Sequence, residues 1–256
     1  NSLPSKDGFF TREYSPSGTP SAGCKPRMYF TKNNASKIDA IRETIKDWYS
    51  QNLINETEHS LLLHDLIMAA NEIANIAGTY GHYLSHFVKR SEDTIHLSPS
   101  IFDPDVNIDG HEIRRGYAEE LANELVADVC YIDPPYIKRQ YAANYHILET
   151  LAREDEPEAI GESGLRPWRD QYSNFCSKVK IRNSFDLILN NIHCNNIFIS
   201  YSEDGLLPIE DLLAFLRQYG NVELSEIRYK RFRSNNSKKG LELTEYLIYL
   251  QKNERV

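Results

Sequence analysis

The sequence predicts an α/β fold whose sheet is mainly parallel and ends in an antiparallel edge. In the second half of the chain, compact apolar runs at 128–132 and 196–201 alternate with longer amphipathic stretches, which is typical of parallel strands joined by helices. The last part departs from this alternation. Two strand-like runs, 222–232 and 243–250, are joined by a polar loop and predict an antiparallel hairpin.

The first half of the chain predicts helices. Residues 1–33 are rich in Ser, Pro, Gly and Lys and predict an extended loop. Asn33 or Asn34 can then cap a helix, because apolar residues recur beyond it at helical spacing: Ile38, Ile41, Ile45 and Trp48. A second helical stretch is expected over 57–88, broken near Gly78. The front of the chain is therefore expected to be helical.

The second half is expected to hold four further helices. They are predicted over 118–125, 141–153, 172–192 and 208–219. Pro208 opens the last of them, at the position where a helix tolerates proline. This change from helical periodicity to alternating strands and helices divides the chain into a loop and helical region, 1–95, and an α/β core, 96–256.

Composition and charge exclude several classes of protein. The 256 residues contain no apolar run near the roughly 20 residues of a membrane helix and no apolar leader, so we expect a cytoplasmic protein. The four cysteines show no close pairing, which predicts neither a metal site nor a disulfide framework. A net charge of −8 argues against a protein that coats nucleic acid, although an enzyme that modifies a base needs only a local basic face.

One such basic face is predicted in the hairpin. Six basic residues stand there within twelve positions, with no acid among them: Arg228, Lys230, Arg231, Arg233, Lys238 and Lys239. These side chains either contact nucleic-acid phosphates or form a solvated face of the hairpin. Both interpretations stay open.

The segment Asp133-Pro134-Pro135-Tyr136 directly follows the apolar strand 128–132. Open α/β sheets bind their ligands at the carboxyl ends of strands, so this segment falls where a functional site is expected. A residue that precedes proline is held in an extended conformation, which fixes the carboxylate of Asp133 and the carbonyl of Pro134 as two acceptors. The alternative is that the segment is only a rigid turn.

Two fixed acceptors suit the chemistry of a conjugated amino group, such as the exocyclic amine of adenine. Its nitrogen lone pair is delocalised into the ring and is a poor nucleophile. Acceptors that take both N–H groups favour a pyramidal nitrogen that can attack an electrophilic methyl group, and Asp133 can stabilise the developing positive charge. Tyr136 offers an aromatic face to a base extruded from the duplex. The segment therefore predicts direct methyl transfer to an amino group.

Four other residues are candidates for binding the same substrate. Tyr141 and Tyr145 follow the segment and either border the adenine pocket or pack structurally. Ser200 and Tyr201 end the next strand, so they border the same crevice at the carboxyl ends of the strands, and they either line the site or lie beside it.

Longer stretches around the segment carry a resemblance to a known family. They cover residues 131–136, 139–141 and 144–150, with further matching stretches at 29–31, 34–35, 38–42, 77–80 and 199–202. Through these residues nearly the whole chain is similar to the adenine-specific (N6) DNA methyltransferases related to Dam, in the restriction-modification branch.

The resemblance implies S-adenosylmethionine as the methyl donor, double-stranded DNA as the partner and an extruded adenine as the acceptor. It also implies a Rossmann-like S-adenosylmethionine-dependent methyltransferase sheet of seven strands that ends in a reversed hairpin. Residues 1–95 would then be a target-recognition insert and 96–256 the C-terminal half of the catalytic core. Asp133 would stand at the shared edge of the donor and acceptor sites.

One feature of the family is missing from the sequence. A Phe-x-Gly-x-Gly turn after the first strand helps to form the family's donor site, and these 256 residues contain no such turn. Residue 1 is Asn rather than Met. We therefore expect the first strands and much of the donor pocket to be supplied by an N-terminal segment or a second chain. Without them, the edge of the strand 128–132 would be unpaired.

Two other functions stay open. The chain could be a DNA-binding or complementing subunit that is inactive without a separate donor-binding segment. It could also methylate amino groups of RNA or protein, since Pro-Pro-Tyr sites at strand ends recur in such enzymes. The aspartate at 133 and the stretch 144–150 favour adenine in DNA.

Overall fold

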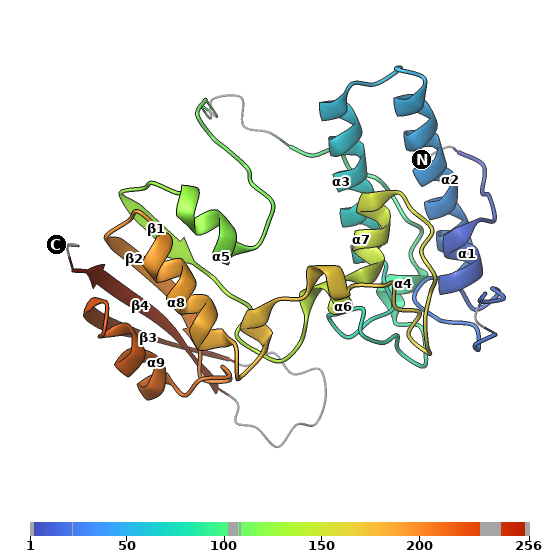
Figure 1. Ribbon diagram of the computed structural model, residues 1–256. Helices are drawn as coiled ribbons and strands as arrows, with labels where there is room; N and C mark the ends of the chain where they lie inside the picture. Colours follow the sequence, from blue (N-terminus) through green and yellow to red (C-terminus); the bar gives the residue numbers. More distant parts are fainter. Residues whose placement is uncertain (1–2, 22, 102–106, 108, 231–241, 254–256) are drawn as a thin grey trace. The chain divides into compact units, whose positions relative to one another are not determined.

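The computed structural model describes residues 3–21, 23–101, 107, 109–230 and 242–253. The chain forms two compact units (Figure 1). The helical unit comprises Asn1–Asp109 and Tyr141–Gln171, and the α/β unit comprises Gly110–Gln140 and Tyr172–Val256. This division differs from the predicted boundary between residues 95 and 96, because the chain returns to the helical unit after residue 140.

The helical unit holds α1 (Phe9–Tyr14), α2 (Lys32–Ser50), α3 (Glu56–Glu72), α4 (Lys89–Glu92), α6 (Tyr141–Asn144) and α7 (His146–Arg153). Thr31 caps α2, because its hydroxyl accepts the N–H of Asn34 at 3.2 Å. The predicted caps, Asn33 and Asn34, therefore lie inside the helix. Asn55 and Glu58 form a capping box at the start of α3.

Aromatic rings fill the core of the helical unit. Tyr14, Tyr29, Tyr80 and His146 are fully buried. The ring of Tyr14 lies edge-on to Tyr29 with centroids 5.7 Å apart, and Tyr29 stacks on Tyr80 at 6.2 Å. This cluster joins α1 and α7 to the loops that follow α1 and α3, so residues far apart in sequence share one core.

The α/β unit holds α5 (Ala118–Leu121), β1 (Val129–Ile132), α8 (Ile181–Asn191), β2 (Asn196–Ser202), α9 (Ile209–Leu216), β3 (Gly220–Lys230) and β4 (Glu242–Lys252). The strand order is β1-β2-β4-β3. The predicted α/β fold with a C-terminal antiparallel hairpin is confirmed. The described sheet is mostly antiparallel rather than mainly parallel, because β4 inserts between β2 and β3 and leaves β1–β2 as the parallel pair.

Helices cover one face of this sheet. Alternate residues of β2, Ile197, Ile199 and Tyr201, are fully buried in a cluster with apolar side chains of α8 and α9. On the other face, Val129 and Tyr131 of β1 are 56% and 62% exposed. β1 is also an edge strand in the described part of the chain.

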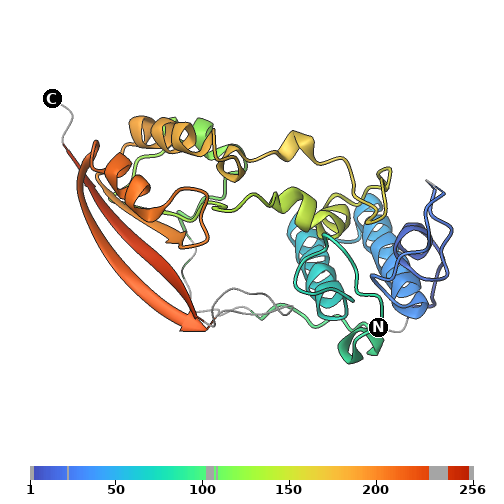
Figure 2. The ribbon, with the colours of Figure 1, turned by 90° about the horizontal axis from the view of Figure 1, so that it is seen from below.

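The β3–β4 hairpin is longer than the strand it packs against. β2 pairs with β4 from Asn196, opposite Gln251, to Ser202, opposite Glu245. β3 continues to pair with β4 as far as Lys230, opposite Glu242. The hairpin therefore extends past the carboxyl end of β2, as its length in Figure 2 shows.

Three predicted elements were wrong in their extent. The loop predicted over 1–33 contains α1, whose N-terminus is capped from α2. The helix predicted over 57–88 ends at Glu72, because side-chain bonds from Asn75 hold the following backbone in a loop. The helix predicted from residue 172 begins at Ile181. No helix in the described part of the chain is long and apolar enough to cross a membrane.

Candidate functional site

The segment Asp133-Pro134-Pro135-Tyr136 leaves β1 at the carboxyl ends of the parallel strands β1 and β2. Ile132 pairs in register with Ile199, so Asp133 follows beside the end of β2. Asp133 is exposed, Pro134 is buried, and the other two residues are half-buried. The carboxylate is therefore open to a ligand while the backbone that carries it is anchored.

Tyr136 is held through its backbone and its ring. Its carbonyl accepts the N–H of Leu206 at 2.8 Å. Its ring lies edge-on to Tyr201, with centroids 5.7 Å apart. These contacts fix the orientation of the ring, as a stacking platform requires.

Ser200 and Tyr201 have different environments. They are consecutive in β2, so their side chains leave opposite faces of the sheet. Tyr201 is fully buried, and burial raises the pKa of its phenol. Its hydroxyl accepts the N–H of Leu207 at 2.9 Å. Tyr201 therefore supports Tyr136 from inside the core, whereas Ser200 is half-buried on the other face.

Glu245 was not among the predicted residues. It lies opposite Ser202 in the β2–β4 ladder. Burial raises the pKa of Glu245, hydrogen bonding with Ser202 and Tyr136 lowers it, and the charges of Asp133 and Asp204 raise it, so that the net shift is upward. The pairing of β2 with β4 brings Glu245 to the site. No local motif in the sequence specifies that pairing.

Tyr141 and Tyr145 belong to the helical unit and are described with that unit alone. They are 56% and 39% exposed, and their rings lie edge-on with centroids 5.9 Å apart. Both line a cavity of about 480 Å³, together with Ile67, Ala142, Leu148, Glu149, Ala152 and Gln171. Their rings are accessible, as contact with a base would require.

The basic hairpin is described in part. Arg228 is exposed on β3, opposite Thr244. The backbone of Lys230 pairs with Glu242. The other four predicted basic residues lie outside the described residues: Arg231, Arg233, Lys238 and Lys239. Because the hairpin extends past the carboxyl end of β2, its described outer part lies toward the same end of the strands as the segment 133–136.

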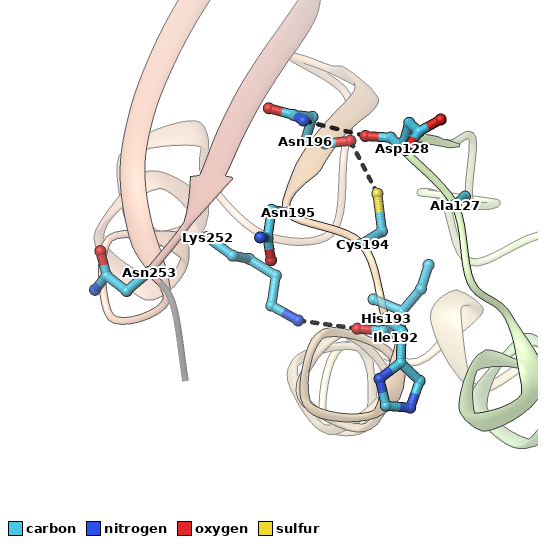
Figure 3. Close-up of a pocket in the computed structure, with 9 residues that line it drawn as sticks. All are labelled: Ala127, Asp128, Ile192, His193, Cys194, Asn195, Asn196, Lys252 and Asn253. Atoms are coloured by element: carbon cyan, nitrogen blue, oxygen red, sulfur yellow. Dashed lines mark hydrogen bonds between the residues drawn. The ribbon is translucent and has the colours of Figure 1, made fainter. Parts of the chain in front are cut away.

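A cavity of about 580 Å³ lies at the opposite ends of β1 and β2 (Figure 3). Asp128 and Asn196, at the start of the two strands, line it together with Lys252. The Lys252 amino group donates to the carbonyls of Leu189 at 2.6 Å and Ile192 at 3.1 Å, which satisfies the C-terminus of α8. The charge of Lys252 thus has a structural role, and this cavity is separate from the segment 133–136.

The chain matches the family model described as D12 class N6 adenine-specific DNA methyltransferase over residues 2–214. It belongs to this family. Its relatives include the type II methyltransferase M.FokI of Planomicrobium okeanokoites, which is 40% identical over 254 residues, covering 97% of this chain and 38% of the relative. The modification methylase StsI of Streptococcus sanguinis is 36% identical over 249 residues, covering 96% of this chain and 37% of the relative.

A third relative of this D12-class chain is more similar to it in length. The type II methyltransferase M.NlaIII of Neisseria lactamica is 33% identical over 230 residues, covering 88% of this chain and 68% of the relative. The chain thus spans less than two fifths of M.FokI and StsI and about two thirds of M.NlaIII. No solved structure matches it.

Proposed function

We propose that the chain carries the acceptor half of an enzyme that transfers a methyl group from S-adenosylmethionine to the exocyclic amino group of adenine in double-stranded DNA. The observation that carries the proposal is the exposed Asp133 carboxylate beside the anchored Tyr136, at the carboxyl end of β1, in a chain of this family. Relatives named as type II and modification methylases support a role in restriction-modification, in the bacterial cytoplasm where DNA lies. Family membership favours DNA over RNA or protein as the substrate.

Asp133 and Pro134 would hold the amino group. The carboxylate of Asp133 and the carbonyl of Pro134 each accept one N–H of adenine, so the nitrogen lone pair leaves conjugation with the ring. S-adenosylmethionine supplies an electrophilic methyl group when bound. Asp133 stabilises the positive charge that develops on the amino nitrogen before that nitrogen loses a proton. Pro135 stiffens the segment, because its ring fixes its own φ.

Tyr136 would stack on the adenine after the base leaves the duplex. Stacking of a base on an aromatic side chain contributes about 1–3 kcal/mol, which offsets part of the cost of extrusion. Tyr141, Tyr145 and Ser200 are proposed to line the rest of the adenine site. Tyr201 would act through Tyr136, because it is fully buried.

The donor site needs a further segment. The Phe-x-Gly-x-Gly turn does not occur in the sequence, and Asp133 would stand at the edge that the donor and acceptor sites share. The outer side of β1 has no strand paired to it in the described part of the chain, and Val129 and Tyr131 are exposed on the uncovered face. An N-terminal segment or a second chain that pairs with β1 would complete the donor pocket.

Two parts of the chain are proposed to bind DNA outside the adenine site. The region 1–95 would recognise the target sequence, which its packing as part of a separate helical unit supports. The basic residues of the β3–β4 hairpin would contact phosphates, because Arg228 is exposed toward the end of the strands that also carries the segment 133–136.

Tritium transfer from S-adenosylmethionine to DNA by the full gene product tests the proposed reaction. Asp133→Ala should lower the rate by about 100-fold or more, because it removes both an acceptor and the stabilising charge. Asp128→Ala is a matched control, since Asp128 precedes the same strand at its other end. No transfer by the wild type, or equal rates for wild type and Asp133→Ala, would contradict the proposal.

The unpaired edge of β1 also favours a second candidate, a complementing subunit that is inactive alone. Equilibrium dialysis with labelled S-adenosylmethionine distinguishes the two. A complementing subunit binds DNA but not the donor, and methylates DNA after a donor-binding chain is added. A self-sufficient gene product binds the donor without any addition.

A further inference from the structure

Gln140 lies at a point where the chain passes from the α/β unit to the helical unit. The chain crosses between the two units three times, after residues 109, 140 and 171. Gln140 is the last residue before the second crossing, and it is buried. We propose that Gln140 is a positioning residue that couples target recognition by the helical unit to methyl transfer at the segment 133–136, an inference that rests on the proposed function.

The side chain of Gln140 joins two of the three crossings. Its Nε2 donates to the carbonyl of Ser173 at 2.9 Å, and its Oε1 accepts the N–H of Ser173 at 2.8 Å. Ser173 is the second residue after the crossing at 171. A glutamine amide carries a donor and an acceptor in one plane, so it pairs with both backbone groups as a neighbouring strand would. Because Gln140 is only 8% exposed, water has little access to these two bonds.

The two joined crossings leave little free chain between anchored residues. At one of them, helix α6 begins at Tyr141, directly after Gln140. At the other, the Nε2 of Gln171 donates to the carboxylate of Glu149 in α7 at 3.0 Å. A single residue then separates Gln171 from Ser173. A displacement of α6 or α7 is therefore transmitted to Gln140 through short, anchored connections.

Gln140 is also closely connected to the candidate catalytic segment. Three residues separate it from Tyr136, whose carbonyl accepts the N–H of Leu206 at 2.8 Å. The thiol of Cys176 donates to the carbonyl of Arg139 at 3.3 Å. The backbone from Tyr136 to Gln140 is therefore held at both ends. A shift of Gln140 would move this backbone, and a misplacement of about 1 Å in a positioned group can lower a rate about 100-fold.

Tritium transfer by the full gene product to two duplexes tests the coupling. The preferred duplex is the sequence that the wild type methylates fastest, and the altered duplex differs from it by one base pair. Gln140→Met keeps the length of the side chain and removes both bonds. It should lower kcat on the preferred duplex about tenfold and leave kcat on the altered duplex nearly unchanged, because the altered duplex has little recognition to transmit.

Affinity for DNA gives a second readout. Fluorescence anisotropy with the preferred duplex should show a change of less than about threefold in Gln140→Met, because a buried side chain contributes no contact to the duplex. Gln218→Met is the matched control, since it makes the same change at an exposed position after α9 in the same unit. It should match the wild type in both rates and in affinity.

Gln171→Met tests the helical side of the same connection. It removes the bond to Glu149 and should reduce the preference between the two duplexes in the same direction. This variant keeps the inference testable if Gln140→Met does not fold. Because both glutamines act in one connection, the double variant should lose no more preference than the more impaired single variant.

Failure of the coupling and failure of the proposed function give different results. An unchanged preference, equal losses on both duplexes, or losses that multiply in the double variant would overturn the coupling while the wild type still transfers methyl groups. A lower thermal midpoint in Gln140→Met with wild-type preference would also overturn it, because Gln140 would then only stabilise the α/β unit. A wild type that transfers no methyl groups would overturn the proposed function, and the coupling with it.

Discussion

Gly205 lies against the ring of Tyr201, so close that a β-carbon at residue 205 would stand 2.3 Å from Cε1 and 2.5 Å from the hydroxyl oxygen. The same hydroxyl accepts the N–H of Leu207, and the neighbouring Leu206 N–H binds the carbonyl of Tyr136. The missing side chain of Gly205 therefore lets the loop after β2 close over Tyr201 and anchor Tyr136.

We predict that Gly205→Ala destabilises the α/β unit by about 1–3 kcal/mol, because the added methyl group overpacks the loop. It should also slow methyl transfer, since the displaced loop carries the Leu206 contact to Tyr136. Urea unfolding and the tritium assay measure the two effects. Gly81→Ala is the control, because a β-carbon there would lie 3.4 Å from Asn144 at ordinary contact distance. An unfolding midpoint equal to that of the wild type would contradict the prediction.

A buried ion pair gives the second prediction. The side chains of Arg27 and Glu13 are fully buried and 3.0 Å apart. The guanidinium also donates to the carbonyls of Gly161 at 2.8 Å and Glu162 at 3.1 Å. Arg27→Met would leave the Glu13 carboxylate buried without this partner, so it should destabilise the helical unit by about 3–5 kcal/mol.

Glu13→Gln should lower the free energy of unfolding less than Arg27→Met does, because the amide oxygen of the glutamine still accepts a hydrogen bond from Arg27. Lys6→Ala removes an exposed ion pair with Glu43 and should cost less than about 1 kcal/mol. Urea unfolding, followed by a probe in the helical unit, ranks the three variants. If Arg27→Met lowers the free energy of unfolding no more than Lys6→Ala does, the buried ion pair contributes no more to the stability of the helical unit than the exposed pair.

The elements that were predicted well owe their structure to local residues. β1 is a compact apolar run that two prolines end, and α9 begins after Pro208, so nearby residues identify both. The hairpin is likewise a local pairing. The same local reasoning predicts the segment 133–136 as a candidate site, because all of its constraints lie within the segment.

The elements that were predicted wrongly depend on distant side chains. The Asp39 carboxylate accepts the N–H groups of Phe10 and Thr11 at 2.8 Å and so caps α1 from α2. The Asn75 amide donates to the carbonyls of Met28 at 2.9 Å and Leu84 at 3.0 Å, which stabilises a loop where periodicity predicts a helix. The position of Glu245 opposite Ser202 likewise depends on the pairing of β4 with β2, which are distant in sequence. Tertiary partners decide these positions, and a single sequence does not show them.

His146 gives a prediction about pH. It is fully buried, and its Nε2 donates to the carbonyl of Tyr80 at 3.1 Å. Burial lowers the pKa of His146 from 6.5 to about 4. Between these two values the unfolded chain binds a proton that the folded chain does not. The stability of the helical unit should therefore fall as the pH drops below about 6.5, and this contribution should level off below about pH 4.

The expected loss from His146 is about 2 kcal/mol between pH 7 and pH 5. His146→Gln keeps a donor for the Tyr80 carbonyl and does not titrate. Between pH 7 and pH 5 its free energy of unfolding should therefore fall by about 2 kcal/mol less than that of the wild type. His193→Gln, an exposed position in the other unit, should follow the wild type. Urea unfolding at a series of pH values measures the difference. Parallel curves for His146→Gln and the wild type would show that His146 does not contribute.

Arg228 gives a prediction about salt. If the hairpin contacts phosphates, Arg228→Gln should weaken binding to all duplexes similarly and reduce the slope of log affinity against log salt concentration by about 1. Arg217→Gln is the matched control, because Arg217 is exposed at the end of α9, before the start of β3 and so at the other end of that strand from Arg228. Fluorescence anisotropy with cognate and unrelated duplexes measures both slopes. Equal slopes for Arg228→Gln and the wild type would leave Arg228 on a solvated face of the hairpin, whereas a loss confined to one duplex sequence would show contact with bases.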